Sequence, residues 1–69
     1  MGKRYIVELE EGVYIADWEG DPGRTTRRGN AMVFDNRWDA VLSAKKAQTY
    51  RPFVNAMLIR LNPDKKEAV

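Results

Sequence analysis

The stretch RYIVELEEGVYIADWE, residues 4–19, decides the fold. Across Arg4–Glu10, large apolar side chains alternate with mostly polar ones, which is the period of two of a half-buried strand. Gly12 tolerates the positive φ that a tight hairpin turn needs. The alternation returns over Val13–Trp18. We therefore predict a β-hairpin, and we expect Tyr14 and Trp18 to share one face of its second strand.

The segments that follow predict a loop and then a helix. Residues 20–30 contain no large apolar side chain and are rich in glycine, which is typical of a loop. Residues 31–34 predict a brief strand or an extended lead-in to the helix. Asp35 or Asn36 can cap that helix. We expect it to end within residues 48–50, because Pro52 disfavours helical geometry in the residue before it.

The C-terminal third predicts one more strand and a tail. Residues 53–61 are apolar on both faces, which favours a central strand or one covered on both sides. Asn62-Pro63 ends this strand, and we expect the charged residues 62–69 to be frayed. The order β-β-(β)-α-β predicts a single α+β domain over residues 1–69, a small antiparallel sheet with one helix packed across it and a structured core of about 4–61.

The strand and helix periodicities meet on one interior, which predicts the hydrophobic core. Nine apolar side chains are expected there: Val7, Leu9, Val13, Ile15, Phe34, Trp38, Leu42, Met57 and Ile59.

The composition argues against an enzyme. The chain has no cysteine and no histidine, so thiolate metal sites, thiol nucleophiles and the usual general base are excluded. Ser43 has no histidine to activate it. Asp17, Glu19 and Asp21 are close in sequence, but their spacing fits no calcium-loop signature. We expect no catalytic site, no metal site and no cofactor.

The chain is also expected to be a soluble cytoplasmic protein. No apolar run reaches the roughly 18 residues needed to span a bilayer. The basic residues near the N-terminus are not followed by the apolar stretch of a signal peptide.

Residues 14–28 predict the surface that binds a partner. Aromatic and arginine side chains, which are enriched at binding hot spots, lie here beside acidic ones. The predicted site comprises Tyr14, Asp17, Trp18, Glu19, Arg24, Arg27 and Arg28. Two alternatives stay open: Trp18 packs under the helix, and the arginines pair with the neighbouring carboxylates at positions 17, 19 and 21.

Four short segments carry a resemblance to a group of known proteins. They are Tyr5-Ile-Val-Glu-Leu, Gly12-Val-Tyr-Ile, Asn30-Ala-Met-Val-Phe-Asp and Trp38-Asp-Ala-Val-Leu. This arrangement resembles small ββαβ-type proteins of bacterial phages and prophages. The resemblance covers most of residues 4–61 as a pattern of apolar positions and caps. It implies a phage or mobile-element origin and a location in the host cytoplasm, and phage proteins of this size often bind and block a host protein, defence nucleases included.

The expected function is a small non-enzymatic protein-binding module. Its partner is a host or phage protein, and a phage accessory protein or host-defence inhibitor acting by occlusion fits the resemblance. The alternative is a small nucleic-acid-binding protein that uses the arginine loop and exposed aromatic side chains. Acidic side chains dominate residues 1–23 and basic ones residues 24–69, so self-association through opposed charges also stays open.

Overall fold

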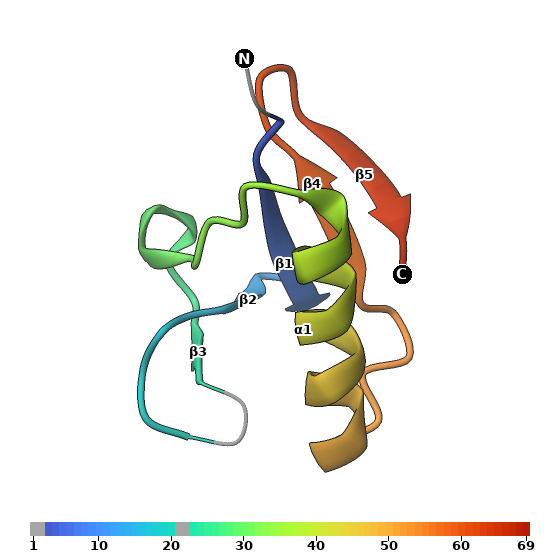
Figure 1. The fold of residues 1–69 in the computed structure, drawn as a ribbon. Coiled ribbons are helices and arrows are strands. Elements are labelled where there is room, and N and C mark those ends of the chain that lie inside the picture. The colour runs from blue at the N-terminus through green and yellow to red at the C-terminus, as the bar shows by residue number, and fades with distance from the viewer. Residues whose placement is uncertain (1–2, 21–22) are drawn as a thin grey trace.

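The chain folds as an antiparallel β-sheet with one α-helix across one of its faces (Figure 1). The computed structural model describes residues 3–20 and 23–69. The strands are β1 (Tyr5–Glu10), β2 (Val13–Ile15), β3 (Arg24–Thr25), β4 (Met57–Arg60) and β5 (Lys65–Ala68). The helices are the 3₁₀ turn η1 (Arg28–Asn30) and α1 (Arg37–Tyr50). The sheet has the order β3-β2-β1-β4-β5, and the predicted α+β class is confirmed.

The predicted hairpin is present, but its second strand is shorter than expected. Glu8 lies opposite Tyr14 in the register of β1 and β2, and an irregularity follows in β1. Strand β2 ends at Ile15, although the backbone N–H of Ala16 still donates to the carbonyl of Gly23 (3.0 Å), and residues 17–20 then bend away from the strand. The prediction that Trp18 lies on this strand is therefore wrong.

Helix α1 begins and ends as predicted. The side chain of Asn36 accepts a hydrogen bond from the backbone N–H of Asp39 (2.9 Å), which caps the helix. Arg51, the residue before Pro52, is extended with φ −145° and ψ 150°.

The face that α1 buries is different from the predicted one. Its buried residues are small: Ala40, Val41, Ala44 and Ala47. The bulky core side chains come instead from the sheet and the connecting segments, namely Tyr5, Leu9, Phe34, Phe53 and Leu58. Large side chains from the sheet already fill the space under the helix. The small side chains on this face of α1 therefore allow the helix to approach the sheet closely. Trp38 is 65 % exposed and Leu42 is 48 % exposed, so the prediction that both belong to the core is wrong.

The other predicted core residues have mixed outcomes. Val7, Leu9, Ile15, Phe34 and Ile59 are buried as predicted, whereas Val13 and Met57 are only partly buried. Ile59 pairs with Ile6 in the register of β1 and β4. This pair lies on the sheet face turned away from α1, because Val7 and Leu58 beside it belong to the cluster under the helix.

The C-terminal segment is a strand, so the prediction of a frayed tail over residues 62–69 is wrong. Strand β5 pairs with β4 along its whole length. Two ion pairs hold it, Arg37 Nε to Glu67 Oε2 (3.0 Å) and Lys66 Nζ to Glu8 Oε1 (3.2 Å). Strand β4 therefore lies between β1 and β5, which explains why the sequence of β4 is apolar on both faces.

The predicted loop over residues 20–30 contains two short ordered elements. Strand β3 pairs with β2 at the edge of the sheet, and η1 follows it. Phe34 then forms an isolated antiparallel bridge with Tyr5. In place of the brief strand expected over residues 31–34, the structure has this single bridge. Of the described helices, none is long and apolar enough to cross a membrane.

Candidate functional site

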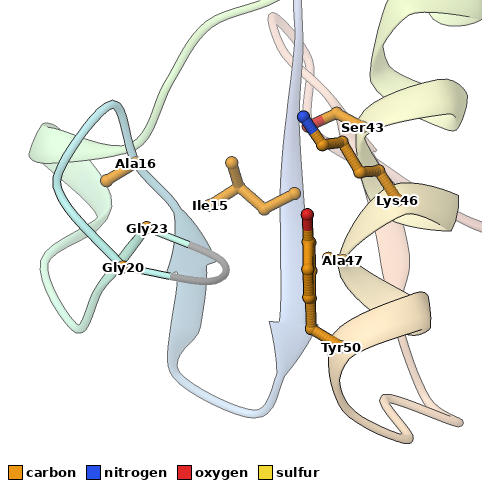
Figure 2. Close-up of a pocket in the computed structure, with 8 residues that line it drawn as sticks. All are labelled: Ile15, Ala16, Gly20, Gly23, Ser43, Lys46, Ala47 and Tyr50. Atoms are coloured by element: carbon orange, nitrogen blue, oxygen red, sulfur yellow. The ribbon is translucent and has the colours of Figure 1, made fainter.

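A pocket of about 170 Å³ lies between the β2–β3 loop and α1 (Figure 2). We call it the loop–helix pocket. Its wall on the side of the sheet and loop consists of Ile15, Ala16, Gly20 and Gly23, and its helix wall consists of Ser43, Lys46, Ala47 and Tyr50. Cavities of about 150 Å³ hold a benzene ring, so the pocket can receive one side chain of a partner.

Glycine fixes the loop wall. A Cβ at position 23 would lie 2.1 Å from the carbonyl oxygen of Trp18 and 2.6 Å from that of Ala16. Both contacts are with backbone, which cannot rotate away as a side chain can. Gly20 has φ 134°, a conformation that side chains with a Cβ rarely adopt. The loop therefore closes on itself, backbone against backbone, beside the helix.

Three polar side chains of α1 form the opposite wall. Ser43, Lys46 and Tyr50 are spaced i, i+3 and i+7, so they lie along one stripe of the helix. Figure 2 shows Lys46 and Tyr50 reaching from α1 toward the side of the loop, with Ile15 between loop and helix. Lys46 forms no ion pair within the described part of the chain.

The lining has an apolar part and a set of hydrogen-bond donors. Ile15, Ala16 and Ala47 supply the apolar surface, while the ammonium of Lys46 and the hydroxyls of Ser43 and Tyr50 are donors. No carboxylate is among the lining residues. The pocket suits a side chain with an apolar stem and a carboxylate or carbonyl end. Residues 3–20 and 23–69 contain no group of three acidic side chains that could hold a metal ion.

Three of the predicted site residues lie on the loop that bounds this pocket. Asp17, Trp18 and Glu19 stand between the lining residues Ala16 and Gly20, and all three are exposed. Trp18 is 55 % exposed, so it does not pack under the helix. Asp21, named above as a neighbouring carboxylate, lies outside the described residues.

The other four predicted residues do not line the pocket. Tyr14 is half-buried and lies opposite Glu8, on the sheet face turned away from α1. Arg24 lies in the edge strand β3, and Arg27 is exposed at the start of η1. Arg28 forms an ion pair with Asp64 in the β4–β5 turn, and not with Asp17 or Glu19, the described acidic side chains of the β2–β3 loop.

Sequence reasoning missed the helix wall. In the sequence, Ser43 stands out only as a hydroxyl without a histidine to activate it, and nothing singles out Lys46. The signal that could have found them is the spacing of Ser43, Lys46 and Tyr50 on one stripe, next to Ala47, which faces the sheet.

Comparisons of the chain with protein-family models, with curated proteins and with solved structures give no match. What this site does must therefore be argued from its own geometry and charge.

Proposed function

We propose that this chain is a small protein-binding module that holds its partner at the loop–helix pocket and at Trp18. One observation carries the proposal. A tryptophan that is 55 % exposed stands on a loop held in place by glycine, beside a pocket large enough for one side chain. Tryptophan is among the residues that contribute most to binding energy at protein interfaces.

The pocket and Trp18 have different roles in binding the partner. A side chain of the partner inserts between the loop and α1, with its stem against Ile15 and Ala47. Its terminal oxygen accepts hydrogen bonds from Lys46 and the hydroxyl groups beside it. The ring of Trp18 packs on the partner surface around the inserted side chain, where it excludes water.

Occlusion is the mode of action that this size allows. The molecule measures 32 × 21 × 19 Å. Its accessible surface is 4852 Å², so the roughly 800 Å² that a stable interface buries on each partner is about one sixth of it. The bound module then blocks whatever site lies beneath it, without chemistry of its own.

The resemblance to small phage and prophage proteins supports a host protein as the partner. We propose a phage-encoded inhibitor that acts in the host cytoplasm on an enzyme of host defence. The ammonium of Lys46, together with two hydroxyls that can donate, favours a partner that presents an acidic or carbonyl-bearing side chain beside an apolar one.

The charges around Trp18 favour a protein partner over a nucleic acid. Asp17 and Glu19 flank Trp18 and repel a phosphate backbone. Arg28 is already paired with Asp64. A stacking platform for bases needs basic side chains next to its aromatic ring, and here the immediate neighbours are acidic.

Affinity capture with matched variants tests the proposal. Immobilised wild-type chain, Trp18→Ala and Trp38→Ala are compared in nuclease-treated bacterial lysate. Trp38→Ala is the matched control, because Trp38 is also exposed and lies away from the pocket. We expect one protein that the wild type and Trp38→Ala retain and that Trp18→Ala loses, together with a similar loss for Lys46→Glu.

Two results contradict the proposal. Capture that survives both Trp18→Ala and Lys46→Glu moves the interface elsewhere. Binding to single-stranded oligonucleotides that weakens steeply with salt and needs Arg27 supports the nucleic-acid alternative instead.

A further inference from the structure

The outer face of α1 is a second surface, which shares only Lys46 with the lining of the loop–helix pocket. Trp38 and Leu42 lie one turn apart on it and are 65 % and 48 % exposed. One flank of the helix is tied to β5 through Arg37 and Glu67, and the other flank lines the loop–helix pocket. Trp38 and Leu42 are thus large apolar side chains on the side of α1 that no described element covers.

The charges on this face are arranged symmetrically about Leu42. The residues three and four positions before it are Asp39 and Trp38, and those three and four positions after it are Lys45 and Lys46. The N-terminal half of the face is therefore acidic and aromatic, and the C-terminal half is basic.

We propose that a second copy of this chain docks on this face, with the two α1 helices antiparallel across a two-fold axis beside Leu42. Such an interface brings residue i of one copy to residue j of the other, and j to i. Leu42 then meets its own counterpart. Asp39 of each copy faces Lys46 of the other, because both lie on the same flank of the Leu42 stripe, and each Trp38 ring receives the stem and ammonium of Lys45.

The groups that this arrangement uses are available. Lys45 and Lys46 form no ion pair with the described side chains. The Asp39 carboxylate accepts a hydrogen bond from the Asn36 amide (2.9 Å) and forms no ion pair with the described side chains. A parallel arrangement brings the two acidic halves of this face to the same height, and the two basic halves likewise, so it pairs no opposite charges.

The dimer is weak. The 14 residues of α1 span about 21 Å at 1.5 Å per residue. One helix face of this length buries less than the standard interface of about 1,600 Å², so we expect a dissociation constant on the order of 100 µM.

Sedimentation equilibrium over chain concentrations from 10 µM to 1 mM measures the dissociation constant of the dimer. We expect the mass to rise with concentration from 8.0 kDa toward twice that value. Leu42→Glu places two like charges on the axis and abolishes the rise. The matched control is Val54→Glu, which makes the same change at a side chain that is 82 % exposed and lies outside α1, and it leaves the rise unchanged.

A charge swap tests the antiparallel pairing itself. Asp39→Lys alone and Lys46→Asp alone each weaken the dimer about five- to tenfold, because every pair occurs twice across the axis. The double variant restores the wild-type constant within about twofold. A chain that stays monomeric at 1 mM overturns the proposal. So does a double variant no tighter than the single ones, or a dimer that Leu42→Glu leaves intact. Each variant is checked for native far-ultraviolet circular dichroism.

Discussion

The carbonyl oxygen of Trp18 occupies the space that a side chain at Gly23 would need, 2.1 Å from where a Cβ would stand. This close backbone approach accompanies the hydrogen bond from the Ala16 N–H to the Gly23 carbonyl (3.0 Å), which joins the two ends of the β2–β3 loop. It also sets the position of Trp18 relative to the helix wall of the pocket. A glycine at position 23 is thus the condition for the proposed binding surface.

Gly23→Ala is expected to destabilise the chain by about 1–3 kcal/mol, because the clash is with backbone and the loop must open to relieve it. Gly29→Ala is the matched control, since a Cβ at position 29 meets nothing within 4 Å. Urea denaturation of the two variants measures the difference. Equal free energies of unfolding would show that the loop is not closed as described.

Trp38→Ala is expected to change the free energy of unfolding by less than about 1 kcal/mol, because its side chain is 65 % exposed. Leu58→Ala, at a fully buried position, should cost about 2–5 kcal/mol, enough to unfold much of so small a domain. Thermal melts followed by circular dichroism distinguish the two. If the Trp38→Ala chain shows no cooperative melt, Trp38 belongs to the core and the exposed position described here is wrong.

Asn36→Ala is expected to cost about 1 kcal/mol, because the backbone N–H of Asp39 loses its acceptor at the start of α1. Asn55→Ala serves as its control, because Asn55 is exposed and lies outside the helix. Asn36→Ser keeps a capping oxygen without adding a second carboxylate beside Asp39, and should stay near the wild-type value. Urea midpoints compare the three, and equal losses for Asn36→Ala and Asn36→Ser would argue against the cap.

Lys66→Ala is expected to cost about 0.5–1 kcal/mol, because it leaves the Glu8 carboxylate, whose side chain is only 11 % exposed, without its cation. Lys65→Ala, the neighbouring lysine without an ion pair, should cost little. The difference between the two variants should shrink in 1 M salt, which screens the pair. A difference that does not respond to salt would point to strand packing as its source.

Most of the fold follows from short-range patterns in the sequence. The alternation in β1, the turn at Gly12, the cap at Asn36 and the stop before Pro52 each act within a few residues, and each is present in the structure. Strand β5 could not be predicted in this way. Its residues are charged, and what makes them a strand is pairing with β4 together with ion pairs to distant side chains.

The prediction of which face of α1 is buried is also wrong, and this face determines both proposed binding surfaces. The sequence offers two stripes on the helix, one with Trp38 and Leu42 and one of alanines. Hydrophobicity alone favours the first stripe, whereas packing against the large side chains of the sheet favours the second. With the alanine stripe against the sheet, Ser43 and Tyr50 face the β2–β3 loop. The pocket therefore depends on an orientation of the helix that the sequence pattern does not predict.

The two tryptophans offer the most direct measurement of the central claim, that the loop–helix pocket and Trp18 hold the partner. Their indole N–H groups give two signals in the ¹⁵N-correlated NMR spectrum, and Trp18→Ala identifies which is which. The captured partner is added to labelled chain at a constant 20 µM, where most of the chain is monomeric for a dimer dissociation constant on the order of 100 µM. The account predicts that the Trp18 indole and the amides of Gly20, Gly23 and Ser43 shift, while the Trp38 indole does not. A Trp18 signal that stays in place while Trp38 or Arg27 shifts would contradict it.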